Sequence, residues 1–228
     1  MDPYSLRLIE EMNRYYEARA PWHDEYMDVR SLEEMTKRFS RILDFIRKYL
    51  DGQRVLEIAC GTGNWTRLIA PLAASVTAVD NSISSLQIAK PKLAEFDNVR
   101  LVQANAYKLD CLNREFDVLF SADFWSHIPK KAIESFLNAA SGKLSPGAYS
   151  IFLDMSWQTF FQSEKSDLDE DVNRVSLRSL PNGSEFHVVK NFPTEDELRE
   201  IIRPFGNAIR FTSFPELQRW LVCFRFLN

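Results

Sequence analysis

The stretch VLEIACGTGNWTRLIAPLAASVTAVD, residues 55–80, contains two features that could bind a nucleoside. An apolar run leads into Gly61-Thr62-Gly63, and a second apolar run ends at Asp80. Glycines let the backbone turn sharply and approach a ligand without a Cβ atom in the way. A carboxylate at the end of the neighbouring strand can accept hydrogen bonds from both hydroxyls of a ribose. The spacing therefore predicts a site for a nucleoside-containing cofactor.

The glycine loop departs from the dinucleotide-binding pattern. That pattern, GxGxxG, needs a third glycine where this chain has Thr66. Glu57 lies in the first apolar run, where it would repel a pyrophosphate but could orient the ammonium of an amino-acid tail, directly or through water. A nicotinamide-dependent oxidoreductase is therefore disfavoured. The alternative that Glu57 only supports the loop stays open.

His127, in SADFWSHIPKK, is the first candidate for a general base. Its imidazole has a pKa near working pH and could take a proton from a phenol, carboxyl or amine. A structural histidine bonded to the backbone is an equal alternative. We expect Trp125 to line an acceptor pocket, whereas Phe124 is the better candidate for a core position.

Alternating strands and helices must position these residues. Apolar strands are predicted at 55–60, 76–79, 99–103, 116–121 and 149–155, and helices at 64–73, 82–95 and 129–141. Near-continuous apolar strands joined by helices indicate a parallel sheet covered on both faces. Ligands of such sheets bind at the carboxyl ends of the strands, where the glycine loop and Asp80 lie.

Helices and antiparallel strands are predicted around this core. Residues 1–50 are expected to be helical, with Ser31 and Glu34 as a capping box for one helix over 31–50, and Asn64 is expected to cap the helix after the glycine loop. The turn Asn182-Gly183 predicts a β-hairpin over 172–189. The acidic run 164–171 is expected to be a solvated loop. Strands at 208–214 and 219–226 are joined by a link too short for a parallel crossover, so they must pair antiparallel.

Four segments, in order, resemble the motifs of class I S-adenosylmethionine-dependent methyltransferases. LEIACGTGNWT is similar to the family's first motif, [DE]xGxGxG, with Ala59 at the first glycine. VTAVDNS resembles the second, VRLVQANAYKL the third and FDVLFSADFWSHIP the fourth. The resemblance spans roughly residues 31–226. It implies a doubly wound, Rossmann-like, mostly parallel sheet of seven strands whose last strand is antiparallel, with an N-terminal helical lid and a hairpin insertion.

The resemblance also implies the cofactor, S-adenosylmethionine, with S-adenosylhomocysteine as product. Asp80 would bind the ribose and Asn81 would lie beside the adenine; Asn105 stands where the family often has Asp, and its side-chain oxygen could still accept from the adenine amino group. The remaining residues that this resemblance assigns to the cofactor are Tyr16, Glu57, Ala59, Gly61, Gly63, Ala106 and Ser121.

The resemblance divides the chain into four parts: a lid over 1–50, a cofactor-binding core over 51–155, a substrate cap over 156–191, and a helix with an antiparallel strand pair over 192–228. In similar enzymes an N-terminal segment like YYEARAPWHDEY, residues 15–26, folds over the cofactor. Tyr16 or Tyr15 could then bond the methionine carboxylate, and Trp22 and His23 could contact the acceptor, although a surface position for His23 and Asp24 is the better expectation.

Composition restricts the partners. The net charge of −4 gives no reason to bind nucleic acid, and three scattered cysteines suit a reducing cytoplasm. No apolar stretch is long enough for a membrane span, and the histidine and cysteine spacing predicts no metal site. Within these limits, the resemblance implies O- or N-methylation of a small molecule by in-line displacement. The alternatives are a cofactor-binding regulatory protein without catalysis, or a protein or RNA methyltransferase; the sequence leaves the oligomeric state open.

Overall fold

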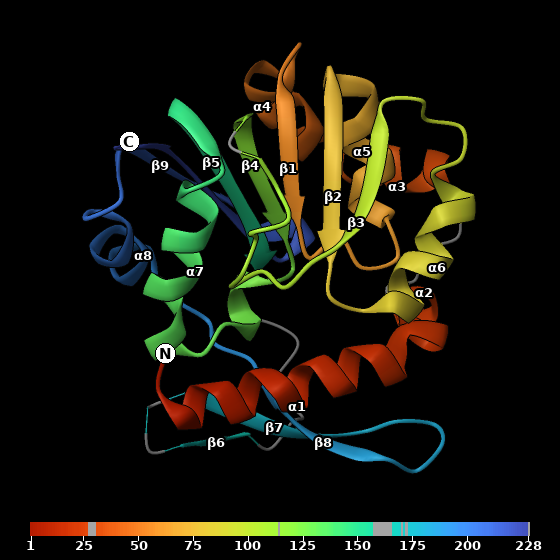
Figure 1. Ribbon diagram of the computed structural model, residues 1–228, viewed down its shortest axis with the longest axis vertical. Helices are drawn as coiled ribbons and strands as arrows, with labels where there is room; N and C mark the ends of the chain where they lie inside the picture. The colour runs from red at the N-terminus through yellow and green to blue at the C-terminus, as the bar shows by residue number, and fades with distance from the viewer. Residues whose placement is uncertain (27–30, 114, 157–165, 170, 172, 228) are drawn as a thin grey trace.

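The computed structural model describes residues 1–26, 31–113, 115–156, 166–169, 171 and 173–227. Its centre is a seven-stranded sheet in the order β3-β2-β1-β4-β5-β10-β9 (Figure 1). The strands are β1 Arg54–Ile58, β2 Ser75–Asp80, β3 Val99–Gln103, β4 Phe116–Ala122, β5 Leu144–Met155, β9 Gly206–Phe214 and β10 Arg219–Phe226. Strand β10 runs antiparallel to both of its neighbours, β5 and β9, while the pairs from β3 to β5 are parallel, so the predicted antiparallel end of the sheet is confirmed.

Helices cover both faces of this sheet. They are α3 Leu32–Arg38, α4 Ser40–Leu50, α5 Asn64–Ile69, α6 Ile83–Lys92, α7 Ile133–Ser141 and α8 Glu195–Ile202, with short 3₁₀ turns at Ala70–Leu72, Trp125–His127, Lys130–Ala132 and Pro215–Leu217. Successive strand residues point to opposite faces. Val55 of β1 therefore packs with Ile42 of α4 on one face, while Leu56 packs with Phe136 of α7 on the other. In Figure 1, α7 lies on the near side of the sheet and α4 and α5 on the far side.

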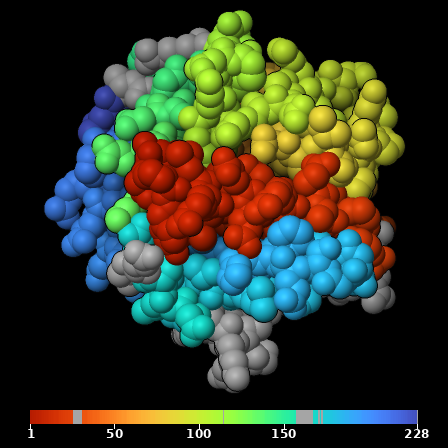
Figure 2. Space-filling model, turned by 60° about the horizontal axis from the view of Figure 1, so that its bottom comes forward, coloured from red at the N-terminus to blue at the C-terminus, as the bar shows by residue number. Residues whose placement is uncertain are grey.

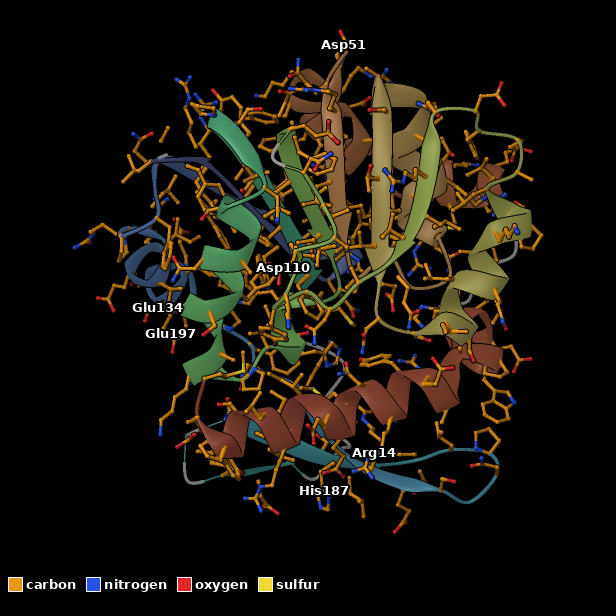
Figure 3. The ribbon with its side chains drawn as sticks, in the orientation of Figure 1. Arg14, Asp51, Asp110, Glu134, His187 and Glu197 are labelled. Carbon is orange, nitrogen blue, oxygen red and sulfur yellow. The ribbon has the colours of Figure 1, made fainter. Side chains whose placement is uncertain are left out.

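The N-terminal helices lie across one end of the sheet. They are α1 Pro3–Arg19, a 3₁₀ turn at Ala20–Trp22 and α2 His23–Tyr26. Figure 3 places Asp51, which precedes β1, at the end of the sheet opposite α1. Helix α1 therefore crosses the carboxyl ends of the parallel strands, where ligands of such sheets bind.

A small second sheet packs on the outer side of α1. It consists of β6 Ser166–Leu168, β7 Arg174–Ser179 and β8 Glu185–Val189, so the predicted hairpin is confirmed. Figure 2 shows β8 running alongside α1 on the surface. Phe186 of β8 meets the edge of Tyr15 at 5.7 Å between ring centroids, and the backbone N–H of His187 donates to Glu11 over 2.6 Å. This sheet therefore holds α1 from outside.

Several predicted boundaries were wrong. The helix expected over 31–50 is broken at Phe39 (φ −99°, ψ 13°), although Ser31 caps α3 as predicted by accepting from Glu34 N–H. Gly63, in the left-handed region, caps α5 in place of Asn64. Part of the acidic run expected as a loop, Ser166–Leu168, forms β6 because its backbone pairs with β7. Trp157, Phe160 and Phe161, aromatic residues of the substrate cap predicted over 156–191, lie outside the described residues.

Within the described ranges, no helix has both the length and the apolar character needed to cross a membrane. All three cysteines carry free thiols; Cys60 and Cys223 are buried and Cys111 is exposed.

Candidate active site

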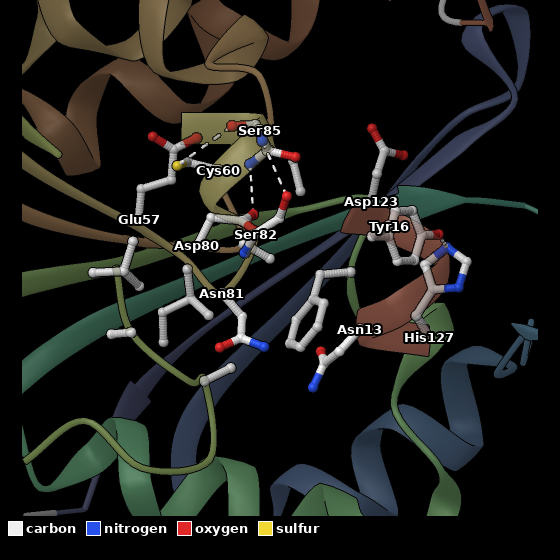
Figure 4. Close-up of a pocket in the computed structure, with 18 of the residues that line it drawn as sticks. Asn13, Tyr16, Glu57, Cys60, Asp80, Asn81, Ser82, Ser85, Asp123 and His127 are labelled. Carbon is white, nitrogen blue, oxygen red and sulfur yellow. Dashed lines mark hydrogen bonds between the residues drawn. The ribbon is translucent and has the colours of Figure 1, made fainter. Parts of the chain in front are cut away.

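A pocket lies beneath α1 at the carboxyl ends of β1, β2 and β4. It encloses about 1160 Å³ of space, including its open mouth. Figure 4 shows Glu57 and Asp80 on one side of this pocket and Tyr16, Asp123 and His127 on the other. Of the residues expected in the site, those that line it are Tyr16, His23, Glu57, Ala59, Gly61, Asp80, Asn81, Asn105, Ala106 and His127.

The loop after β1 has the unusual backbone that its glycines predict. Gly61 has φ +54° and Gly63 φ +80°, and Ala59 adopts φ +60° where the family's motif has glycine. A Cβ atom on Gly63 would approach Leu93 Cδ1 to 3.0 Å and Ala89 Cβ to 3.2 Å, so this glycine allows α5 to begin close to α6. Gly61 faces the pocket, whereas Gly63 is not among its lining residues.

Asp80 is fixed by the backbone on both of its oxygens. One oxygen accepts from Gly61 N–H over 2.7 Å and the other from Ser82 N–H over 2.8 Å. Burial raises the pKa of Asp80, while the bonds from Ser82 and Gly61 act in the opposite direction. Each oxygen keeps a further lone pair, so the carboxylate can accept two hydroxyl groups from a ligand in the pocket.

Glu57 is a buried carboxyl group with a free oxygen. The residue is 1% exposed, and its Oε2 has no hydrogen-bond partner among the described residues. Burial, together with the charge of Asp80, raises the pKa of Glu57 to about 8. A buried polar atom without a partner is costly unless a ligand satisfies it. Glu57 is therefore suited to accept from a cationic group of a ligand.

Tyr16 and His127 form a hydrogen-bonded pair on the opposite side. The Tyr16 hydroxyl lies 2.7 Å from His127 Nε2, and His127 Nδ1 lies 2.7 Å from the carbonyl oxygen of Val189. Lys190 Nζ is 3.3 Å from the same Nε2 and also contacts Ser126 Oγ at 2.8 Å. Burial, followed by the charge of Lys190, holds the pKa of His127 well below its usual range, so this imidazole is neutral at physiological pH.

The N-terminal segment is tied to the glycine loop. Asp24 accepts from Thr62 Oγ1 over 2.7 Å and from Asn64 Nδ2 over 2.9 Å, and it pairs with Lys92. His23 lies over the loop, and burial lowers its pKa to about 4. His23 and Asp24, expected on the surface, are partly buried, because α2 packs on the loop through these side chains.

Asp123 is a pocket residue that the sequence analysis did not identify. It follows β4 with φ +57°, forms an ion pair with Arg219 of β10 and accepts from Trp65 Nε1 over 3.2 Å. A non-glycine residue in the left-handed region is strained and is often found at a functional site. The sequence feature that could have identified Asp123 is its position directly after an apolar strand, at the edge of the sheet where ligands bind.

Three other expected residues lie away from the pocket, and Asn105 lines it with its side-chain oxygen already bonded. Trp125 is 2% exposed and packs on Phe152 in the core, so the expectation that it lines the acceptor pocket is not met. Ser121 Oγ donates to the Ile58 carbonyl over 2.9 Å and links β4 to β1 instead of facing the pocket. Trp22 is also absent from the lining. Asn105 lines the pocket but uses its side-chain oxygen to accept from Tyr107 N–H over 2.9 Å.

Among the residues whose positions are described, no group of three or more His, Cys, Asp or Glu side chains could hold a metal ion.

Comparison with known proteins places this geometry in context. Residues 55–147 match the family described as "Methyltransferase domain". A relative from Staphylococcus aureus (strain MRSA252), named demethylmenaquinone methyltransferase, is 26% identical over 155 residues. That match covers 66% of this chain and 62% of the relative, so the chain spans less than two thirds of that protein's length.

Solved structures extend the similarity to almost the whole chain. The DhpI–SAH complex has a TM-score of 0.75 with 28% identity, and the DhpI–SAM–HEP complex has 0.73 with 25%; both comparisons cover 96% of this chain and 97% of the other. The PH0226 protein of Pyrococcus horikoshii OT3 has a TM-score of 0.69 with 16% identity, covering 85% of this chain and 91% of that one, which shows the fold alone.

Proposed function

Because the chain belongs to the class I S-adenosylmethionine-dependent methyltransferases, we propose that it transfers a methyl group from this cofactor to the oxygen or nitrogen atom of a small molecule. The arrangement of charged and polar groups in one covered pocket carries the proposal. Glu57 and Asp80 face one part of the cavity, and Tyr16 and His127 face another (Figure 4). A donor and an acceptor could therefore lie side by side beneath α1.

The residues on the Glu57 side fit the cofactor. Asp80 can accept from the two ribose hydroxyls, because its backbone bonds leave a lone pair on each oxygen. The unpartnered oxygen of Glu57 can accept, directly or through water, from the ammonium of the methionine part. Asn81 and Ala106 lie on the lining, where they can border the adenine. When bound, the cofactor supplies an electrophilic methyl carbon attached to a positively charged sulfur.

The protein contributes mainly orientation and exclusion of water. Helix α1 contributes Ile9, Met12, Asn13 and Tyr16 to the wall of the pocket, and the bonds of Asp24 hold the following segment over the glycine loop. Holding two reactants in line in such a site can lower the barrier by several kcal/mol, up to about 7–11 in ideal cases.

A small-molecule acceptor is supported by the relatives. The Staphylococcus aureus relative is named for demethylmenaquinone, and DhpI has been solved with SAM and HEP together. Ile9, Met12 and Phe124 add apolar surface to the lining of this pocket, while Asn13, Tyr16, Asp123 and His127 add polar groups. This lining favours an acceptor with an apolar body and one polar reacting group.

Calorimetry tests the cofactor site directly. Titration with S-adenosylhomocysteine should show saturable binding to the wild-type protein, and Asp80→Asn should weaken it by about 100-fold or more, since charge-assisted hydrogen bonds contribute about 1.5–3 kcal/mol each. Asp97→Asn, an exposed aspartate in a turn of the same domain, is the control. Folded wild-type protein that binds neither S-adenosylmethionine nor S-adenosylhomocysteine would contradict the proposal.

A further inference from the structure

We propose that Tyr16 is a catalytic residue that passes the proton of the acceptor to His127, and that the acceptor is a small molecule with a neutral hydroxyl group. This inference rests on the proposed function and names the substrate class for the same pocket. It departs from the expectation that Tyr16 binds the carboxylate of the cofactor.

The direction of the hydrogen bond between Tyr16 and His127 follows from the second nitrogen of the ring. A carbonyl oxygen can only accept, so His127 Nδ1, 2.7 Å from the Val189 carbonyl, must carry a proton. In a neutral imidazole the other nitrogen, Nε2, is then an acceptor. The Tyr16 hydroxyl at 2.7 Å therefore donates its hydrogen to Nε2.

This arrangement leaves Tyr16 with a lone pair and no free hydrogen. A tyrosine hydroxyl has one proton to donate, and that proton is already directed at His127. A ligand carboxylate needs a donor, which Tyr16 cannot offer without breaking the bond to His127. A ligand hydroxyl can instead donate to the Tyr16 oxygen and keep that bond intact.

His127 itself is blocked from direct contact with an acceptor. Its Nδ1 is bonded to Val189, and its Nε2 is shared by Tyr16 and by Lys190 at 3.3 Å. Both Tyr16 and His127 line the pocket, but only the tyrosine oxygen keeps a lone pair for an incoming O–H group. The geometry therefore makes a chain: acceptor hydroxyl, Tyr16 oxygen, His127 Nε2.

The step balances without another reactant. The acceptor oxygen forms a bond to the methyl carbon while the carbon–sulfur bond breaks, and that electron pair remains on sulfur. The acceptor O–H bond breaks as its proton moves to the Tyr16 oxygen and the Tyr16 proton moves to His127 Nε2. The products are a neutral methylated oxygen, a neutral thioether and an imidazolium, so the positive charge moves from sulfur to His127.

A weakly basic histidine is adequate for this role. As the acceptor oxygen gains the methyl group it acquires positive charge, and its proton becomes strongly acidic. The proton therefore moves downhill even to an imidazole whose pKa is lowered by burial and by Lys190. The same environment favours loss of the proton from His127 once the products have left.

Nuclear magnetic resonance tests the direction of the bond independently of activity. The protein has three histidines, so the His127 ring can be assigned by comparison with a His127→Gln variant. We expect a neutral ring with its proton on Nδ1, and a changed Nε2 resonance in Tyr16→Phe. A proton on Nε2 in the wild-type protein would overturn the proposal, because Tyr16 could not then donate to that nitrogen.

Calorimetry with S-adenosylhomocysteine separates this proposal from the cofactor assignment. Tyr16→Phe should bind this probe within about two-fold of wild type, equivalent to about 0.4 kcal/mol. A ten-fold or larger loss would place Tyr16 at the cofactor carboxylate and overturn the proposal while the methyltransferase function stands. Failure of the wild-type protein to bind the probe would instead contradict the proposed function itself.

A matched pair of acceptors provides a kinetic test. Phenol keeps its proton at pH 8, whereas thiophenol is ionised and needs no base. Tyr16→Phe and His127→Gln should each slow methylation of phenol by about 100-fold, the usual size of general acid–base catalysis, and that of thiophenol by less than about three-fold. Equal losses for both compounds would overturn the proposal. If the wild-type protein methylates neither phenol nor thiophenol, the nuclear magnetic resonance and calorimetry experiments test the role of Tyr16 without this assay.

Discussion

Asp24 accepts a 2.9 Å hydrogen bond from the side-chain amide of Asn64, which joins the N-terminal segment to the first turn of α5. The same oxygen accepts from Thr62 Oγ1 over 2.7 Å, and the carboxylate also pairs with Lys92 of α6. The three partners hold the pKa of Asp24 below its usual value despite partial burial. One carboxylate therefore ties the segment that covers the pocket to the two helices beside the glycine loop.

Removing this carboxylate should loosen the cover of the pocket. We expect Asp24→Ala to increase amide hydrogen exchange over residues 10–26 and to weaken binding of S-adenosylhomocysteine by about ten-fold, since three charged or polar contacts are lost. Glu25→Ala is the control, because that neighbouring side chain is exposed. Unchanged exchange in Asp24→Ala would show that α1 and the small sheet hold the segment without it.

Relief of backbone strain at Ala59 should stabilise the protein. Its φ of +60° costs an L-residue roughly 1–2 kcal/mol relative to glycine. Part of this gain is offset because glycine is more flexible in the unfolded chain, so Ala59→Gly should raise the free energy of unfolding by about 0.5–1 kcal/mol. Urea denaturation provides the measurement.

Ala208 offers a matched control for Ala59. It has φ +53° in β9, far along the sheet from the pocket. Ala208→Gly should stabilise to a similar extent, and neither change should alter cofactor affinity by more than about two-fold. A destabilised Ala59→Gly variant would contradict the strain argument.

Cofactor binding should release a proton from Glu57. Its pKa of about 8 in the ligand-free protein leaves it mostly protonated at pH 7. A ligand ammonium beside it favours the ionised form and lowers this pKa, so affinity should increase as pH rises toward 8. Calorimetry at pH 7 in two buffers of different ionisation enthalpy should count about one proton released per S-adenosylhomocysteine bound. Glu57→Gln should release none, and equal release by both proteins would refute the assignment.

Lys190 should control the protonation of His127. The groups that act on this ring are Tyr16 and Arg19 of α1, Arg178 of β7, Lys190 and the Val189 carbonyl. Lys190→Gln removes one positive charge but keeps donors for Ser126 and Asp154, so the pKa of His127 should rise. A resonance titration of His127 in the variant and in the wild-type protein measures this change. A fall in the pKa would contradict the electrostatic role of Lys190.

Because folding lowers the pKa of His127, the free energy of unfolding should depend on pH. A histidine that is held neutral in the folded state binds its proton more readily when unfolded, so stability is lost as pH falls below the unfolded value near 6.5. Lys190→Gln should weaken this acid dependence. Thermal unfolding between pH 7 and pH 5 checks the difference in slope, relative to the wild-type protein.

The pocket residues proposed to bind the cofactor could be predicted from sequence to lie together because they are close along the chain. Glu57, Gly61 and Asp80 lie within one β-α-β unit, and the alternation of apolar strands and helices fixes which ends of the strands meet. The antiparallel pairing of β9 with β10 followed from their short connection alone. Such rules need no knowledge of distant contacts.

The part of the pocket around Tyr16 and His127 could not be predicted in this way because distant segments build it. Tyr16 and His127 are 111 residues apart, and Asp24 and Asn64 are 40 apart. Pairing of this kind has no periodic signal, so the contacts of the partly exposed Asp24 with Thr62, Asn64 and Lys92 were not expected. Trp125 lies in a 3₁₀ turn that directs its ring onto Phe152, a choice that composition does not reveal.

Helix α1 and the hairpin that contains β8 pack against each other. A change of substrate would therefore have to alter both segments together. Tyr15 packs on Phe186, and Glu11 binds the backbone and ring of His187, so each segment is shaped to the other. The part of the pocket proposed to bind the methyl donor, by contrast, comes from a continuous stretch of chain. New acceptor preferences in this lineage would therefore arise by coordinated replacement of the first helix and the hairpin, and chimaeras that import one without the other should fold poorly.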